Sequence, residues 1–527
     1  GKNSIRKLKL PHRVFIGVCQ MIRTKVCLSL TGSTLAENIA ILDKYRKWID
    51  VAELRVDYLN ADERLHIRKF PELAKIPCIL SIRRVVDGGK FTEGEAARTV
   101  LFARGIAFAN QDSRKNFSYI DIETDFNVPS IQDAALAFGT RIIRSSYLKE
   151  EPIGNLQNRI NKLRLAGFEI PKISYEPRSL SDVTQLFHQA KQLKEFEQII
   201  AVRGQLALPS RILATKLHSL LTYTLPKELL DEQRPHGGID PISLSEIYNF
   251  ESINEKTKVF AITGYPLLHV LSPKIHNEAY RTKKMNNVFI PLRAQRIEES
   301  IEFAEELSIS GITVSRPFKN TVKDFIPTID ENAGYSFTCD AIIRENDSWS
   351  GFNLSVNALS ETLCKFIGRK NLAGMKIAII GAGTETRTVS YVVKLLKGKA
   401  CIFNNPVSQA KKIADLFSFK SASLSEDSLS KISSYSDLII QTKTENVDIV
   451  RYGGVDIVYD PIPFYEFTGN EYVFDCTYNP HPNPLIVRAK KSGCNTANSF
   501  DMIQRQSRAH FELFTGVPYD KQEFDSE

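Results

Sequence analysis

Between residues 25 and 224 the sequence repeats one pattern, in which a short apolar run is followed by a longer amphipathic segment. Eight of these runs have the length and composition of β-strands, and helix-like segments separate them. The strand-like runs are 25–30, 51–56, 77–82, 118–122, 141–145, 170–174, 198–202 and 220–224. The helix-like segments are 34–47, 61–69, 94–109, 130–138, 155–166, 179–193 and 209–218. Helical crossovers make consecutive strands parallel, and a count of eight predicts a (β/α)8 barrel. An open doubly wound sheet is the alternative, because the repeat alone does not separate the two.

The sequence beyond the barrel predicts two further α/β units. A polar stretch at 246–258 reads as a linker, and a strand-like run at 259–266 begins a new series. After a second boundary near 364–375, five runs indicate an open Rossmann-type sheet: 376–380, 400–403, 437–441, 456–459 and 472–476. We expect an N-terminal extension (1–20), the barrel (21–245), the linker (246–258), a middle α/β domain (259–365), a Rossmann-type dinucleotide-binding domain (366–492), and a C-terminal helix that returns to the middle domain (493–527).

Composition limits the classes of function that this chain can serve. Its 527 residues exceed one ordinary core, and 43% apolar with 25% charged residues is typical of a soluble globular protein. The sequence contains no run of 18 apolar residues, so we expect no membrane span. The net charge of +8 is mild, and the basic residues form no stripe interleaved with aromatics. Small anionic ligands are therefore favoured over nucleic acid.

The eight cysteines are far apart in the sequence and include no C-x-x-C pair. This spacing favours reduced thiols over a disulfide framework or a zinc site. We expect a cytoplasmic protein without a metal.

Charged and polar residues stand at or after the ends of the predicted barrel strands. They are Glu53 and Arg55, Arg83, Asp121 and Glu123, and Ser210 with Arg211, while Lys172 lies inside the apolar run I-P-K-I-S. Active sites of such barrels lie at the carboxyl ends of the strands. A buried lysine is costly to keep charged, so its pKa falls and it becomes a nucleophile, or it pairs with a nearby carboxylate. Residue type alone leaves both interpretations of Lys172 open.

Five motifs in the first half carry a specific resemblance. They are V-A-E-L-R-V-D-Y, S-I-R-R-V-V-D-G-G, R-I-I-R-S-S-Y, E-I-P-K-I-S and G-Q-L-A-L-P-S-R. In order and spacing, over about residues 24–240, they resemble type I 3-dehydroquinate dehydratase. The resemblance implies that Lys172 forms a Schiff base with a substrate ketone. It also implies that four residues hold the substrate's carboxylate and hydroxyls: Glu53, Arg55, Arg83 and Arg211.

The general base of this family is a histidine, and Tyr147 stands in its place. Tyrosine is a poor base near neutral pH, because its pKa is about 10. His236, in the loop P-H-G-G, is a second candidate base, and the alternative is an ordinary surface histidine.

Three motifs in the second half resemble the substrate site of shikimate dehydrogenases. They are G-Y-P-L-L-H-V-L-S-P-K-I-H-N, G-I-T-V-S-R-P-F-K and S-G-F-N-L-S. The resemblance implies that Lys319 handles the hydroxyl proton and that Ser355 stands where the family has an aspartate. It implies substrate contacts for Ser272, Ser315, Asp340 and Gln506. Val270 replaces one carboxylate-binding serine, and Asp340 replaces an asparagine, so its charge is expected to repel an anionic substrate.

The turn G-A-G-T-E-T-R, at 381–387, resembles the dinucleotide turn of the same dehydrogenases. The resemblance implies NADP as cofactor, with contacts from Gly381, Ala382, Gly383 and Thr384, and from Asn404 at the end of the next strand. Glu385 would place a carboxylate at the amino end of the helix, where a pyrophosphate rests. The run N-N-P at 404–406 lacks the arginine that grips the 2′-phosphate in this family.

Together the motifs resemble a fused, bifunctional dehydratase–dehydrogenase of the shikimate pathway, with 3-dehydroquinate, 3-dehydroshikimate and shikimate as ligands. The substitutions predict weakened or lost dehydrogenase activity. The alternative is a catalytically inactive descendant that acts as a ligand-binding or regulatory protein. A scaffold without a ligand is a third hypothesis, and the retained cluster of Glu53, Arg55, Arg83, Lys172 and Arg211 argues against it.

Overall fold

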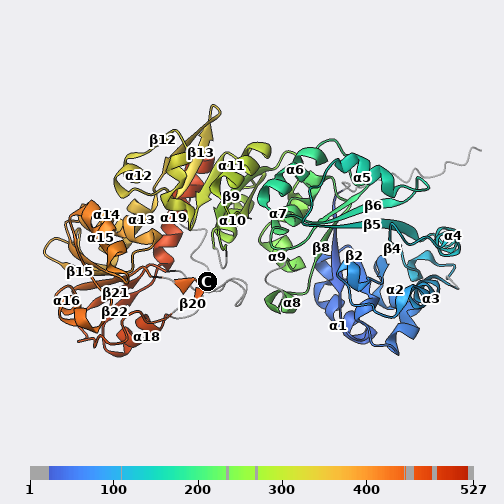
Figure 1. The fold of residues 1–527 in the computed structure, drawn as a ribbon, viewed down its shortest axis with the longest axis horizontal. Helices are drawn as coiled ribbons and strands as arrows, with labels where there is room; N and C mark the ends of the chain where they lie inside the picture. The colour runs from blue at the N-terminus through green and yellow to red at the C-terminus, as the bar shows by residue number, and fades with distance from the viewer. Residues whose placement is uncertain are drawn as a thin grey trace, which may run out of the picture.

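The computed structural model describes residues 23–107, 110–232, 237–267, 271–443, 445–446, 456–457, 459–477 and 483–519. The predicted extension at 1–20 lies outside these residues, as do His236 and Val270. The barrel forms one end of the molecule, the C-terminal domain forms the other, and the middle domain lies between them (Figure 1).

Eight parallel strands form a nearly closed barrel, as the repeat predicted. The sheet order is β7-β6-β5-β4-β3-β2-β1-β8, and a parallel bridge between Gln198 and Ser219 links its two edges. The strands are β1 (Lys25–Leu30), β2 (Val51–Arg55), β3 (Cys78–Ser81), β4 (Tyr119–Glu123), β5 (Arg141–Lys149), β6 (Ile170–Glu176), β7 (Ile199–Val202) and β8 (Leu221–Thr224). The barrel is thus confirmed, and the open doubly wound sheet is excluded for this half.

The barrel helices follow the predicted segments with two local differences. They are α1 (Leu35–Tyr45), α2 (Phe70–Ala74), α3 (Gly94–Ile106), α4 (Pro129–Ala137), α5 (Leu156–Leu163), α6 (Leu180–Ala190), α7 (Leu208–Ile212) and α8 (Lys227–Glu232). The predicted helix at 61–69 is a 3-10 helix, η3 (Glu63–Lys69), which continues into α2. The last predicted segment divides into α7 and a 3-10 helix, η6 (Ala214–Leu217). Pro71 and Pro209 lack an amide N–H, so each suits the first turn of a helix and not its interior.

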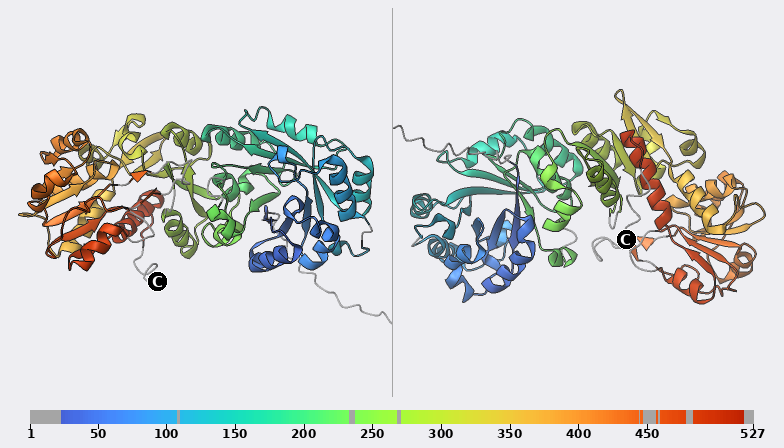
Figure 2. Two further views of the ribbon diagram at one scale, coloured as in Figure 1. Left: turned by 60° about the horizontal axis from the view of Figure 1, so that its bottom comes forward. Right: turned by 180° about the vertical axis from the view of Figure 1, so that it is seen from behind.

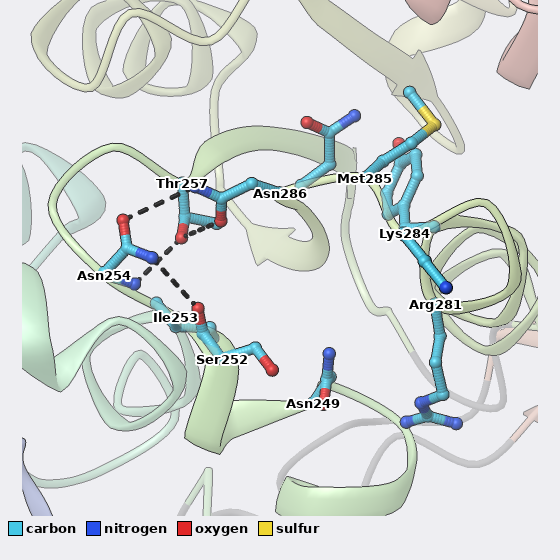
Figure 3. A pocket seen from close by; sticks show the side chains of 11 residues that line it. Asn249, Ser252, Ile253, Asn254, Thr257, Arg281, Lys284, Met285 and Asn286 are labelled. Atoms are coloured by element: carbon cyan, nitrogen blue, oxygen red, sulfur yellow. Dashed lines mark hydrogen bonds between the residues drawn. The ribbon is translucent and has the colours of Figure 1, made fainter. Parts of the chain in front are cut away.

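The linker is an ordered joint between the barrel and the middle domain. It contains the end of α9 (Pro241–Glu246) and a 3-10 helix, η8 (Phe250–Ser252). Thr257 Oγ1 accepts from Asn254 N at 2.8 Å and donates to Asn286 Oδ1 at 2.7 Å (Figure 3). They tie the linker to Asn286, which directly precedes a middle-domain strand (Asn287–Arg293), and the three residues help to line a cavity of about 380 Å³.

The middle domain is a mixed sheet of six strands in the order β10-β9-β11-β13-β14-β12. The strands are β9 (Lys258–Gly264), β10 (Asn287–Arg293), β11 (Gly311–Val314), β12 (Thr328–Ile329), β13 (Ala341–Glu345) and β14 (Ser348–Phe352). The helices are α10 (Ser272–Thr282), α11 (Ile297–Glu306), α12 (Glu331–Ser336) and α13 (Ser355–Ile367). The last helix, α19 (Phe500–Thr515), packs against α10 and α13 and runs beside the middle domain (Figure 2).

The C-terminal domain contains a six-stranded parallel sheet in the order β17-β16-β15-β18-β21-β22. The strands are β15 (Lys376–Ile380), β16 (Lys399–Phe403), β17 (Lys420–Ala422), β18 (Leu438–Gln441), β21 (Tyr472–Asp475) and β22 (Asn495–Ala497). The helices are α14 (Thr384–Leu395), α15 (Val407–Phe417), α16 (Leu429–Ser433) and α18 (Pro484–Lys491). The Rossmann-type sheet is confirmed.

The predicted strand at 456–459 does not belong to this sheet. The structure has a short strand, β20 (Asp456–Ile457), which pairs antiparallel with β19 (Glu445–Asn446) in a separate two-stranded sheet. A short apolar run indicates extended backbone but does not identify its partner strand, so the assignment was wrong. None of the helices in the described part of the chain is both long and apolar enough to cross a bilayer.

Candidate functional sites

Lys172 lies at the centre of the barrel and is paired with a carboxylate. Its Nζ lies 2.6 Å from Asp121 Oδ2, and the two residues are 1% and 3% exposed. Ser145 donates to the other oxygen of Asp121 at 2.6 Å, and the Tyr223 ring lies 4.6 Å from Nζ. These residues come from β4, β5, β6 and β8, whose inward-facing side chains meet in the barrel interior.

The charge on Lys172 depends on the balance between burial and this ion pair. Burial alone would lower its pKa, but Asp121, with smaller contributions from Tyr223, Tyr147 and Glu53, raises the pKa above its ordinary value. The amine is therefore an ammonium at rest. Of the two interpretations left open by the sequence, the structure contains the ion pair, so Lys172 must lose a proton before it can act as a nucleophile.

Glu53 is a second buried carboxylate beside the lysine. Burial disfavours its charged form, but Lys172, Arg83, Arg55 and a hydrogen bond from Ser29 outweigh burial and lower the pKa of Glu53 to about 2. Ser29 donates to Oε2 at 2.6 Å, and Oε1 lies 3.6 Å from the Arg83 guanidinium. Glu53 Oε1 has no hydrogen-bond partner within the described chain, so it is free to accept one from a ligand.

Several buried donors around Lys172 also lack partners among the described residues. They are Arg83 Nε, Arg203 Nε, Arg211 Nε and the Tyr223 hydroxyl. Burial lowers the pKa of Arg211 to about 10, and its guanidinium donates to the Tyr223 carbonyl. Unpartnered buried donors are costly, so this arrangement favours a ligand that carries a carboxylate and hydroxyls.

Arg55 and Tyr147 have other contacts than the sequence implied. Arg55 forms two hydrogen bonds to Asp57, at 2.9 and 2.7 Å, and so is already paired. The Tyr147 ring lies between two guanidinium groups, 5.1 Å from Arg83 and 5.5 Å from Arg203. Burial raises the pKa of Tyr147, so an even smaller fraction of its hydroxyl is deprotonated and able to act as a base near neutral pH.

A second cavity, of about 360 Å³, lies between the middle domain and the C-terminal sheet. It brings together most of the residues predicted for the second site: Ser272, Ser315, Lys319, Ser355, Gln506, Ala382, Gly383, Thr384 and Asn404. Asp340 and Gly381 are not among the residues that line it. No group of three or more metal-ligating side chains occurs in the part of the chain that the structure covers.

Asp340 is 1% exposed and faces the amino end of α13 instead of the cavity. Its carboxylate accepts hydrogen bonds from the backbone N–H groups of Leu354, at 2.9 Å, and Ser355, at 2.7 Å. The Ser355 hydroxyl and Gln506 Nε2 also donate to it, and His510 Nε2 lies 3.2 Å away. Donors and a helix amino end thus surround this charge, and the expected repulsion of an anionic ligand stays a prediction.

The turn before α14 keeps the shape of a dinucleotide cradle. Gly381 has φ +110°, and a Cβ there would meet Thr442 and Lys443 within 3 Å, so glycine is required. Thr386 Oγ1 donates to the Gly381 carbonyl at 3.2 Å and lies 2.8 Å from Thr442 Oγ1, which braces the turn. A Cβ at Gly383 would meet nothing within 4 Å, so space remains beside the helix end.

Charges at this turn differ from those that a phosphate prefers. Glu385, in the first turn of α14, places Oε1 2.8 Å from Lys319 Nζ. At the end of β16, Asn404 Nδ2 donates to the Pro406 carbonyl, and Asn405 Nδ2 donates to the Leu424 carbonyl at 2.6 Å. Both side chains are neutral, so residues 404–406 place no positive charge where the 2′-phosphate of NADP is expected.

Sequence reasoning missed the partners that define both sites. Asp121 was visible as a polar residue at a strand end, and Tyr223 as an aromatic in the last barrel strand. Each of their contacts with Lys172 joins positions that are 51 residues apart in the sequence. Nothing in the sequence indicated that Glu385 would reach Lys319, 66 residues away.

An eight-stranded barrel with a buried lysine, followed by a middle domain and a Rossmann-type sheet, defines a protein with one barrel site and one dehydrogenase-type site. A family model for type I 3-dehydroquinase matches residues 26–255, and one for the shikimate dehydrogenase substrate binding domain matches residues 262–339. The chain thus belongs to the shikimate dehydrogenase family, and in the same polypeptide its barrel matches the type I 3-dehydroquinase model.

Relatives with both parts cover most of the chain. The bifunctional 3-dehydroquinate dehydratase/shikimate dehydrogenase of Arabidopsis thaliana is 24% identical over 497 residues, which are 90% of this chain and 79% of that protein. The shikimate biosynthesis protein AroDE of Chlamydia pneumoniae is 20% identical over 498 residues, 93% of this chain and 95% of that protein.

Another relative matches the second half of the chain alone, and one solved structure aligns with most of its length. The shikimate dehydrogenase (NADP(+)) of Halothermothrix orenii is 30% identical over 278 residues, 50% of this chain and 93% of that protein. The solved dehydroquinate dehydratase and shikimate dehydrogenase from S. pombe AroM covers 95% of this chain and 97% of that chain, with 18% identity and a TM-score of 0.39.

Proposed function

We propose that the chain is a bifunctional shikimate-pathway enzyme. Its barrel dehydrates 3-dehydroquinate through a Schiff base on Lys172, and its second half binds 3-dehydroshikimate and shikimate with weakened NADP-dependent activity. The observation that carries the proposal is the set of unpartnered polar groups around Lys172: Glu53 Oε1, Arg83 Nε, Arg211 Nε and the Tyr223 hydroxyl. The alternative is an inactive descendant that binds these ligands or regulates.

The first step uses the ion pair between Lys172 and Asp121. Asp121 Oδ2, 2.6 Å from Nζ, takes a proton, and the neutral amine attacks the ketone carbon. A C–N bond forms, the ketone oxygen leaves as water, and the ammonium and ketone together give an iminium ion. Arg83 and Arg211 are positioned to receive the carboxylate and hydroxyls, and Glu53 to accept a hydroxyl proton in a hydrogen bond.

The second step is elimination. The iminium acidifies the neighbouring C–H, a base removes that proton, and the β-hydroxyl leaves as water. Hydrolysis of the iminium then restores Lys172, so the net change is the loss of one water. Tyr147, with its raised pKa, stands at the base position, and we therefore propose that proton removal limits the rate.

The second half fits its ligands in part. Ser272, Ser315 and Gln506 offer hydrogen bonds in the cavity, and Lys319 offers a proton to the reacting oxygen. NADP, when bound, would supply hydride chemistry. The turn at Gly381 and Gly383 suits the dinucleotide in shape, but Glu385 and the neutral Asn404 do not suit its phosphates.

A dehydration assay with the full chain tests the proposal. Formation of the conjugated enone from 3-dehydroquinate is followed by absorbance for the parent, Tyr147→His and Lys172→Met. We expect slow turnover by the parent, none by Lys172→Met, and turnover about 10²-fold faster with Tyr147→His, because an imidazole moves protons near neutral pH. If the parent and Tyr147→His both bind 3-dehydroquinate but neither turns it over, the result supports the inactive descendant instead.

A further inference from the structure

One ion pair connects the middle domain with the dinucleotide turn. Lys319 lies on a 3-10 helix, η9 (Phe318–Asn320), that follows β11, and Glu385 lies in the first turn of α14. The two side chains are 11% and 24% exposed and approach to 2.8 Å across the cavity. The acid–base candidate of one domain is thus held by a carboxylate from the other.

Glu385 does not cap its own helix. Gly383 is the N-cap of α14 and has no side-chain cap, while the Glu385 carboxylate turns to Lys319. The free N–H groups at this end therefore keep their capacity to bind an anion, but a negative charge stands beside them. A dinucleotide pyrophosphate that approaches this end meets a like charge at short range.

Glu385 is also the direct carboxylate partner of Lys319. Asp340, the other buried acid near this site, has its oxygens bonded to Leu354, Ser355 and Gln506. Removing the charge of Glu385 therefore changes both the anion site and the contact of Lys319, and it leaves the Asp340 network intact.

We propose that Glu385 is a specificity-determining latch, which excludes dinucleotide phosphates while it is bound to Lys319 and must leave the lysine before a cofactor can enter. This inference rests on the proposed function of the second half. The latch acts on the pyrophosphate, which NAD and NADP share. Because the end of β16 presents neutral Asn404 and Asn405, the extra 2′-phosphate of NADP gains nothing there.

Calorimetric titration of the full chain with NAD⁺ and with NADP⁺ tests the latch. We expect Glu385→Gln to lower both Kd values by at least about tenfold relative to the parent and by similar factors, since one short-range repulsion is removed. Glu426→Gln removes the same charge from an exposed position in the same domain and serves as the matched control, with unchanged Kd values. Equal Kd values for the parent and Glu385→Gln overturn the latch.

A second measurement reports on Lys319 without a cofactor. Brief acetylation followed by mass spectrometry should label Lys319 several-fold faster in Glu385→Gln, because the carboxylate no longer engages its amine. Labelling of the exposed Lys411, which pairs with Asp415, should not change. Unchanged labelling of Lys319 means that the ion pair does not hold the lysine, and it overturns the proposal.

The two measurements separate failure of the latch from failure of the proposed function. Tight dinucleotide binding by the parent, equal to that of Glu385→Gln, leaves the dehydrogenase function standing and removes the latch. Faster Lys319 labelling in Glu385→Gln without dinucleotide binding contradicts the cofactor site itself, and the latch falls with it.

Discussion

Lys172 remains charged inside an apolar barrel because two carboxylates, Asp121 and Glu53, surround it. A buried ammonium without partners would lose its proton, and a buried carboxylate would gain one. Here each group stabilises the charged form of the other, and the pKa values of Lys172 and Glu53 move in opposite directions. The same network holds Asp121 Oδ2 2.6 Å from the Lys172 amine, close enough to take the proton in the proposed mechanism.

The charged form of Glu53 stabilises the barrel, and this stabilisation is lost at acid pH. Its pKa is lowered from 4.5 to about 2, so the stabilisation by its charged form is complete above about pH 4.5 and disappears as the pH falls towards 2. The size of this contribution is on the order of 3 kcal/mol. Scanning calorimetry from pH 3 to 7 should show that the parent loses more stability on acidification than Glu53→Gln does.

The control for this titration is Glu195→Gln, an exposed position in the same half of the chain. Its acid profile should follow that of the parent. Parallel profiles for the parent and Glu53→Gln would contradict the assigned role of the Glu53 charge.

At the scale of single elements, α13 begins on a buried carboxylate. Asp340 accepts from two backbone N–H groups at the amino end of α13, and the helix dipole adds to their attraction. The same carboxylate orients Ser355 and Gln506, which line the second cavity. Asp340 therefore couples the start of a helix to the shape of a binding site.

Asp340→Ala should destabilise the middle domain by about 3 kcal/mol, because the N–H groups of Leu354 and Ser355 lose their acceptor and the buried His510 loses its carboxylate contact. Urea denaturation followed by circular dichroism measures the loss. Asp324→Ala, at an exposed position of the same domain, should change the free energy of unfolding by less than about 0.5 kcal/mol. A loss for Asp340→Ala no greater than this control would contradict the helix-start role.

The sequence predicted elements better than it predicted partners. All eight barrel strands lie within a few residues of their predicted positions, because each buried strand is a short apolar run between amphipathic segments. The run at 456–459 failed because strand pairing depends on the rest of the fold. Likewise, the candidate residues Lys172 and Lys319 were visible in the sequence, but contacts with Asp121 and Glu385 arise from folding across domains or strands.

At the scale of the whole molecule, the barrel and the middle domain share one continuous apolar cluster. It runs from the barrel strands through Phe187 on α6 and Phe303 on α11 to the middle sheet. The two rings meet edge to face, with centroids 5.5 Å apart. An ion pair between Lys191 and Glu306 borders this contact, and His188 Nδ1 lies 3.1 Å from Glu306 Oε2. The C-terminal sheet packs in two other apolar clusters, one of which also contains residues of α13 and α19.

Phe303→Ala should weaken the junction between the barrel and the middle domain. The side chain is fully buried, and its removal should cost about 3–5 kcal/mol. We expect the calorimetric transition of the barrel to separate from that of the middle domain. Phe325→Ala, at a position that is 46% exposed, is the control and should leave the transitions unchanged. A single unchanged transition in Phe303→Ala would mean that the shared cluster does not couple the two domains.

The central claim, a Schiff base on Lys172, is tested most directly by chemical trapping. The full chain is incubated with 3-dehydroquinate and reduced with borohydride, and the modified residue is located by mass spectrometry. We expect a covalent adduct on Lys172 in the parent and none in Lys172→Met. The absence of a mass shift in a parent that binds 3-dehydroquinate, or an adduct on another lysine, would contradict it.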